Sequence, residues 1–232
     1  MTSSRSPGIP IDPQVLILAS GEFGNKVARR LASDYSCTIL DVERGTHPSL
    51  WPRTDLIVLA TDAERPWLSH AIDRTAFVRS IPWFPVYPRA TDLHCGPVVI
   101  PGQTACYWCF ERRRKQHGRS SGQSSPDAAP PSGYPLYEVG ICVGLARQAI
   151  SEAFEGPVSR TLGGTVRMFN VISGTLNMMP VVAVDRCQRC RGRFGSDEAE
   201  RHELWRRLQA VTEGVQLLST TAQRSTAEVA AS

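Results

Sequence analysis

Four cysteines are the residues of this sequence whose types and spacing point most directly to chemistry. They form two Cys-x-x-Cys pairs, Cys106 with Cys109 and Cys187 with Cys190. Zinc binds thiolates in a tetrahedron, and each such turn supplies two sulfurs on one side of it. The pattern therefore predicts one structural Zn²⁺ held by all four sulfurs. Because four sulfurs leave no position open for water or substrate, we expect the ion to be structural and not catalytic.

Two alternatives to a shared zinc site are two independent redox pairs and four unrelated core cysteines. Neither pair is predicted to follow a strand and open a helix, which is the setting of thioredoxin-like redox pairs. Paired spacing in an intracellular chain favours a metal over a disulfide framework. A shared site would join the middle of the chain to its later part and stabilise the fold by closing a long loop.

A glycine turn after the first predicted strand is a candidate phosphate site. Residues 19–24 read Ala-Ser-Gly-Glu-Phe-Gly, which resembles G-x-G-x-x-G with alanine in the first position. The intact motif holds a phosphate against the free N–H groups of a helix N-terminus. The candidate ligands for ATP with Mg²⁺ are the two glycines, a lysine one turn later and the acids at the next two strand ends: Gly21, Gly24, Lys26, Asp41 and Asp62.

These residues have two interpretations. Asp41 is placed to accept a hydrogen bond from a ribose hydroxyl, and Asp62 to help hold magnesium. Alternatively, the turn has kept its shape and lost its ligand. Glu22 favours the second interpretation, because a carboxylate inside the cradle would repel a phosphate, although Lys26 would offset part of that repulsion.

The elements that must position these residues follow from apolar patterning. Short apolar runs predict strands, and helical spacing or an initial proline predicts helices between them. The predicted strands are 14–19, 37–42, 55–60 and 82–87, and the predicted helices are 25–33 and 66–78. This order is typical of an α/β fold with a Rossmann-like, mostly parallel sheet whose strands are buried on both faces.

The apolar pattern of the second half of the chain predicts a different arrangement of strands and helices. Residues 96–100 are expected to be a strand leading into the first cysteine pair, and residues 135–154 a mostly buried helix. Residues 165–172 and 176–184 are expected to pair as antiparallel strands around a turn at Ser173 and Gly174. The predicted fold is therefore a Rossmann-like sheet with an antiparallel extension and a four-cysteine zinc clasp.

The composition bounds the domain organisation. The chain has 232 residues, of which 41% are hydrophobic and 21% charged, as in ordinary globular proteins. We expect one domain over residues 13–213, flexible ends at 1–12 and 214–232, and a mobile loop at 119–133, which is rich in Ser, Pro and Gly. No apolar run approaches the length of a membrane span, and the first dozen residues carry no secretory signal, so we expect a cytoplasmic protein without a membrane partner.

The net charge is a modest +4, and one basic run stands out. It consists of Arg112, Arg113, Arg114 and Lys115. Such a run is typical of a solvated helix face, and we expect no nucleic-acid partner. Nearby, His94 and Cys95 are adjacent, so on a strand they would point to opposite faces and would not form a nucleophile–base pair.

Together these pieces resemble the ThiF-type fold, which is shared with ubiquitin-activating enzymes. The resemblance runs from about residue 15 to 195 and includes the glycine turn, the acidic strand ends and both cysteine pairs. Residues 82–117 are more specifically similar to the ThiF-like partner proteins of YcaO cyclodehydratases, which make azoline rings in ribosomal peptides such as bacteriocins and thiopeptides. In that branch Gly-Pro-Val-Val-x-Pro-Gly, here 96–102, leads into Cys-x-x-Cys and an arginine-rich helix, here 112–117.

This resemblance implies a partner protein that is not itself catalytic. The YcaO enzyme would bind ATP and activate the peptide amide, while the ThiF-like chain would keep the zinc, present the precursor peptide and stimulate its partner. The resemblance also implies a homodimer. The charge of residues 112–115 separately predicts that they bind an acidic precursor peptide. Two features differ from the resemblance. Only residues 1–12 precede the first strand, where the branch usually has a winged-helix module. Residues 43–52 contain Arg44 but no lysine, whereas the adenylating members use an arginine and a lysine there. The alternatives are an ATP-dependent adenylyltransferase that activates a carboxylate, and a zinc-stabilised dimeric scaffold.

Overall fold

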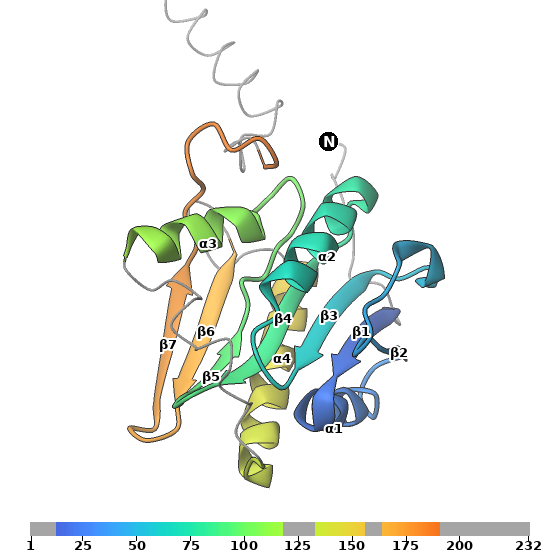
Figure 1. The fold of residues 1–232 in the computed structure, drawn as a ribbon, viewed down its shortest axis with the longest axis vertical. Coiled ribbons are helices and arrows are strands. Elements are labelled where there is room, and N and C mark those ends of the chain that lie inside the picture. Colours follow the sequence, from blue (N-terminus) through green and yellow to red (C-terminus); the bar gives the residue numbers. More distant parts are fainter. Residues whose placement is uncertain (1–12, 118–132, 156–163, 191–232) are drawn as a thin grey trace, which may run out of the picture. The chain divides into compact units, whose positions relative to one another are not determined.

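A seven-stranded sheet runs through the part of the chain that the structure describes (Figure 1). The structure is a computed structural model, and it describes residues 13–117, 133–155 and 164–190. These residues belong to the first of two compact units, which spans residues 1–194. The strand order is β2-β1-β3-β4-β5-β6-β7. The predicted flexible ends, and the predicted mobile loop up to residue 132, lie outside the described residues.

The first four strands are parallel, as the predicted order of strands and helices along the chain indicated. They are β1 (Val15–Ser20), β2 (Cys37–Asp41), β3 (Leu56–Thr61) and β4 (Trp83–Arg89). The connections contain α1 (Gly21–Leu31), the short 3-10 helix η1 (Pro48–Leu50) and α2 (Pro66–Arg79). Every residue of β1 and β3 is buried, whereas β2 lies at the sheet edge and is largely exposed. The expectation of burial on both faces is therefore wrong for β2.

The remaining strands are antiparallel, so the predicted extension is confirmed. They are β5 (Asp92–Cys95), β6 (Thr165–Asn170) and β7 (Thr175–Pro180). The predicted strand at 96–100 does not form, and β5 precedes it. Gly96 has φ +110°, and a Cβ there would lie 2.5 Å from the carbonyl oxygen of Thr165. This turn ends β5. The Gly96 N–H donates to the Pro85 carbonyl of β4, and the chain next pairs with β4 through the bridge between Val99 and Trp83.

Helices cover both faces of the sheet and make two separate cores (Figure 1). Helices α1 and α4 (Leu136–Glu155) pack on one face, and α2 and α3 (Tyr107–Gln116) on the other. The helix predicted to start at residue 25 begins four residues earlier. Residues 21–24 are thus the first helical turn and not a separate loop, and the Asn25 amide donates to the Gly21 carbonyl at 2.8 Å.

A buried ion pair ties α4 to the antiparallel extension. Arg167 on β6 lies 2.7 Å from a carboxylate oxygen of Glu152, and both side chains are at most 2% exposed. The other oxygen of Glu152 accepts a hydrogen bond from the Thr165 backbone N–H at 2.9 Å. Because Glu152 belongs to α4 and Arg167 to β6, the pair links this helix to the sheet.

None of the described helices combines the length and the apolar character that crossing a bilayer requires.

Candidate functional site

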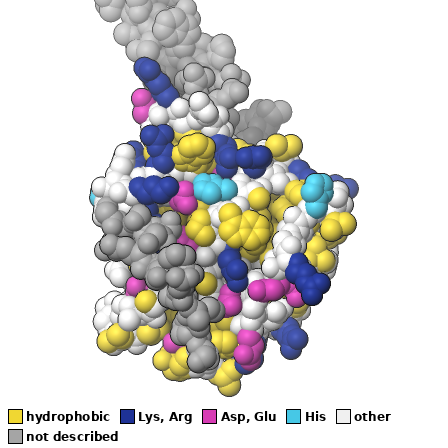
Figure 2. Space-filling model, viewed as in Figure 1, with side chains coloured by type: hydrophobic (Ala, Val, Ile, Leu, Met, Phe, Trp, Pro, Cys, Tyr) yellow, Lys and Arg dark blue, Asp and Glu magenta, His cyan; other side chains and the backbone are white. Residues whose placement is uncertain are grey.

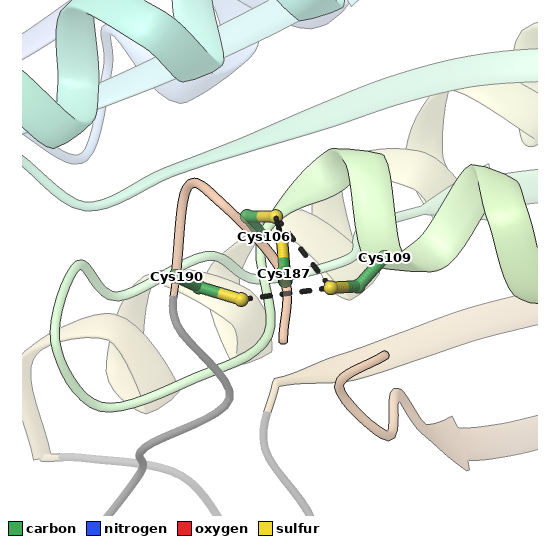
Figure 3. A group of neighbouring side chains, drawn as sticks. All are labelled: Cys106, Cys109, Cys187 and Cys190. Carbon is green, nitrogen blue, oxygen red and sulfur yellow. Dashed lines mark hydrogen bonds between the residues drawn. The ribbon is translucent and has the colours of Figure 1, made fainter. Parts of the chain in front are cut away.

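The four predicted metal ligands come together in one buried cluster (Figure 3). The sulfur of Cys106 lies 3.7 Å from those of Cys109 and Cys187, and the sulfur of Cys109 lies 3.5 Å from that of Cys190. All four sulfurs fall within 4.8 Å of one another. A tetrahedron with Zn–S bonds of about 2.3 Å has edges of about 3.8 Å. The spacing of the sulfurs therefore fits a tetrahedral ion of that size.

The chemistry of the cluster also fits a cation. Hydrogen bonding with Cys109 and Cys190, together with burial, raises the pKa of the Cys106 thiol far above its usual range. A metal ion binds thiolates, so it would supply the positive charge that four buried sulfurs need in order to lose their protons. In addition, the Val184 N–H lies 3.3 Å from the Cys109 sulfur as a hydrogen-bond donor. The four cysteines can thus hold a metal ion, and zinc is the ion that this ligand set favours.

The first pair sits at a helix N-terminus, which differs from the prediction. Cys106 is the N-cap of α3, and Tyr107 is its first residue. The positive end of the helix dipole therefore favours thiolates at this pair. The redox alternative required two independent pairs, but each sulfur of the first pair lies beside a sulfur of the second. A single shared site accounts for this arrangement.

Asp73 of α2 orients both halves of the cluster. This side chain is completely buried and accepts hydrogen bonds from Trp83 Nε1 at 3.1 Å and from the Tyr107 N–H at 3.2 Å. Its second oxygen pairs with Arg189, which stands between Cys187 and Cys190. One carboxylate thereby fixes the start of α3 and the second cysteine turn against α2.

The glycine turn and the acidic strand ends meet at the carboxyl ends of β1 and β3. The chain continues from β1 to one side and later returns on the other, so this is the switch point at which open α/β sheets bind ligands. Gly21 has φ +72°, and a Cβ there would lie 2.4 Å from Asp62 Cγ. A Cβ on Gly24 would lie 2.2 Å from the carbonyl oxygen of Ala60. Both glycines are thus required by close packing, with or without a nucleotide.

An internal carboxylate stands where a phosphate would bind. Glu43, just beyond β2, accepts hydrogen bonds at one oxygen from the Ser20 hydroxyl at 2.5 Å and the Gly21 N–H at 3.1 Å. Asp41 holds Glu43 in place by accepting from its backbone N–H at 2.7 Å. Arg65 lies 3.2 Å from Asp62 and 3.8 Å from Glu43. The helix N-terminus that the motif would offer to a phosphate is therefore already capped by an anion.

Lys26 has partners of its own. Its ammonium lies 2.9 Å from a carboxylate oxygen of Glu22 and 4.9 Å from the centre of the Tyr134 ring. The hydrogen bond to Glu22 raises the pKa of Lys26, and the same contact lowers the pKa of Glu22. Glu22 is therefore paired with Lys26, and the charge that the sequence predicted would repel a phosphate is partly neutralised by this lysine.

The four residues of the basic run have different surroundings on α3. Arg112 and Lys115 are exposed, and Lys115 lies 3.8 Å from Glu111. Arg113 donates to the backbone carbonyls of Val182 and Ala183, whereas Arg114 pairs with Glu64 at 2.6 Å. Figure 2 shows Lys and Arg side chains gathered in the region of α3. The run is therefore only in part the solvated face that its sequence predicted.

The sheet order and the cysteine cluster together define the fold of the described residues. It is an α/β fold with a mostly parallel Rossmann-like sheet, an antiparallel extension and a cluster of four cysteines that can hold a metal ion. The fold predicted from the sequence is thus confirmed.

Solved structures with a similar fold include a heterocyclase, a chain of a microcin synthetase complex and a protein solved with ATP. The heterocyclase TruD is 19% identical with a TM-score of 0.51, over 78% of this chain and 28% of that one. A chain of the E. coli microcin synthetase McbBCD complex is 16% identical with a TM-score of 0.55, over 81% and 71%. E. coli MccB, solved with ATP, is 14% identical with a TM-score of 0.54, over 77% and 66%.

This chain spans about a quarter of the heterocyclase chains that it matches, namely 26% and 28% of their lengths. At such identities the likeness concerns the fold. Comparison with known protein families and with curated protein sequences gave no match.

Proposed function

We propose that this protein is an accessory component of a peptide-modifying cyclodehydratase. It would present a precursor peptide to a YcaO-type enzyme and stimulate azoline formation, acting as a homodimer in the cytoplasm. The observation that carries the proposal is Glu43, whose carboxylate occupies the helix N-terminus at which an adenylating enzyme of this fold would need a phosphate. The fold shared with a heterocyclase and with a microcin synthetase chain supports the same role.

Under this proposal the protein contributes binding and positioning. A bound zinc ion would supply a cross-link between α3 and the segment that follows β7. Arg113 reinforces that link through its bonds to the Val182 and Ala183 carbonyls, at 3.4 Å and 3.0 Å. Peptide-contacting groups on α3 and β7 are thereby held at constant separation, which lowers the entropic cost of ordering them when a peptide binds.

An ATP-dependent adenylyltransferase is the second candidate. The similarity to MccB, which was solved with ATP, favours it. It would require Gly21, Lys26, Asp41 and Asp62 to hold ATP with Mg²⁺, and it would require Glu43 to leave the helix N-terminus. The dimeric scaffold differs from both candidates because it needs neither ATP nor a peptide.

The stimulation itself is the direct test. Mixing the zinc-loaded protein with a YcaO-type enzyme and precursor peptide from the same gene neighbourhood should raise the rate of azoline formation at least about tenfold, since bringing peptide and enzyme together raises the effective concentration. Mass spectrometry would follow the loss of one water for each ring. An unchanged rate across a range of protein concentrations would contradict the accessory role.

Titration with magnesium-ATP separates the first two candidates. We expect no saturable binding to the wild-type protein at millimolar ATP in calorimetry. Glu43→Ala should lose about 1 kcal/mol of stability with its helix cap, and should gain stabilisation by Mg-ATP in thermal unfolding because the first N–H groups of α1 become free. Glu22→Ala is the matched control, because it removes a carboxylate of the same turn that does not cap α1. If the wild type instead bound magnesium-ATP saturably, and Asp41→Asn or Asp62→Asn abolished that binding, the adenylating enzyme would be the function.

A further inference from the structure

A cavity of about 720 Å³ lies between α3 and the antiparallel extension. Its walls come from α3, from β4 to β7 and from the residues just beyond β7. This volume is within the range of sites that hold small ligands or short peptide segments. The cavity is distinct from the glycine turn and the acidic strand ends, which follow β1, β2 and β3.

The charges around this cavity are of one sign. Its lining includes Arg89, Arg113, Arg114 and two histidines, and it includes no aspartate or glutamate. Glu64 neutralises Arg114 at 2.6 Å. In contrast, Arg113 bonds to two carbonyls and to Gln116, all neutral groups, and Arg89 makes no ion pair with any residue in the described ranges. Two positive charges therefore face the cavity without a compensating carboxylate from the described part of the protein.

His94 adds a buried polar atom without a partner. The side chain is 2% exposed, lines the cavity and stacks on Tyr87 with ring centres 4.6 Å apart. Its Nδ1 has no hydrogen-bond partner among the described residues. Burial, aided by Arg114 and Arg89, lowers the pKa of His94 to about 3, so the ring is neutral and does not add a third charge. Leaving such an atom unpaired costs free energy, which a ligand with a matching donor or acceptor would recover.

The wall that the sheet forms is largely apolar and partly open to solvent. Val166 and Met168 of β6 and Met179 of β7 lie on the face that carries His94, in agreement with the pairing of Met168 with His94 and of Val166 with Met179. Met179 is 38% exposed, and Val182 beside it is 49% exposed. Methionine adapts its shape to varied apolar partners, so this wall suits a segment with leucine-like or aromatic side chains.

We propose that this cavity binds an acidic peptide segment that also carries apolar side chains. Carboxylates of the segment would pair with Arg89 and Arg113, a polar group would bond to His94, and apolar side chains would pack on the methionine wall. This inference rests on the proposed function and narrows it, because it gives the precursor peptide a chemistry and a place. It also assigns the contact to the cavity side of α3, and Arg112 and Lys115 are not part of its lining.

Binding of two synthetic peptides to the full, zinc-loaded protein tests the proposal. The first alternates aspartate and leucine over eight residues and carries an uncharged dye, and the second has lysine in place of aspartate. Fluorescence anisotropy should show saturable binding of the first peptide, weakened by added salt, and at least about tenfold weaker binding of the second. Equal affinities for the two peptides would overturn the proposal.

Variants place the binding in the cavity. Arg89→Glu should weaken binding of the acidic peptide at least about tenfold, because it replaces an attraction with a repulsion. It should fold normally, since Arg89 makes no ion pair within the described residues. Arg74→Glu on the exposed side of α2 is the matched charge reversal and should leave affinity within about twofold. His94→Phe keeps the stacked ring but removes the polar atom, and it should weaken binding about fivefold.

The outcomes separate this inference from the function on which it rests. Unchanged affinity in Arg89→Glu, with azoline formation still stimulated, would reject the cavity and leave the accessory role standing. Binding that behaves as expected without any stimulation would reject the accessory role and keep the cavity. If Arg89→Glu instead changed the sedimentation of the protein and not its peptide affinity, the cavity would belong to an interface with a second copy and the proposal would fail.

Discussion

Replacing Cys109 with alanine is expected to release the metal and to lower the free energy of unfolding by about 4 kcal/mol or more. A cross-link that closes a loop as long as the one between the two cysteine pairs restricts the unfolded chain by about that amount. The metal-free variant would also retain three buried sulfurs without a cation. Metal content by atomic emission should fall from one zinc per chain to none, and urea unfolding should report the lost stability.

Cys95→Ala is the matched control for this experiment. Cys95 is also completely buried, but it packs in the core on the α4 face and lies outside the cluster. Burial raises the pKa of its thiol to about 12, so it remains a neutral core residue. Its loss should cost about 1 kcal/mol and leave the zinc in place. Retention of a full equivalent of metal by Cys109→Ala would show that the four sulfurs do not form one site.

Arg167→Met is expected to destabilise the fold by about 3–5 kcal/mol, because it leaves the buried carboxylate of Glu152 without its cation. In the double variant Glu152→Leu with Arg167→Met both charges are absent, and stability should return to within about 1 kcal/mol of the wild type. Urea unfolding of the wild type, both single variants and the double variant measures the coupling free energy directly. Zinc content should stay at one per chain throughout, since the pair lies on the opposite face of the sheet from the cysteines.

The exposed pair of Arg147 with Asp34 provides the comparison. These side chains are 51% and 34% exposed, so solvent screens their attraction. Arg147→Met should cost less than about 1 kcal/mol. The loss of unfolding free energy in the double variant could instead equal the sum of the losses in the two single variants. That result would contradict the interpretation of Arg167 and Glu152 as a coupled, buried pair.

The sequence by itself determined those features that depend on local pattern. Apolar runs and helical spacing predicted β1, β3, β4, α2 and α4 to within a residue or two, because the apolar periodicity of an element depends only on the residues inside it. The Cys-x-x-Cys spacing likewise singled out the four cysteines that the structure brings together, since a turn of that length can place two sulfurs on one side of an ion. The glycines at 21 and 24 were singled out as candidate nucleotide ligands, whereas the structure explains them by their close approach to Asp62 and Ala60.

The tertiary structure decided what depends on neighbours distant in sequence. No local sequence pattern predicts that Glu43 caps α1, because the pairing of β1 with β2 brings Ser20 and Gly21 to Glu43. The position of β2 at the sheet edge, and not its composition, leaves it exposed. Strand β5 is short and largely polar, so its register with β4 and β6 was needed to place His94 opposite Met168. The sequence therefore did not predict that Arg89 and His94 line one cavity, because a cavity forms between elements and its charge is the sum of side chains that only folding brings together.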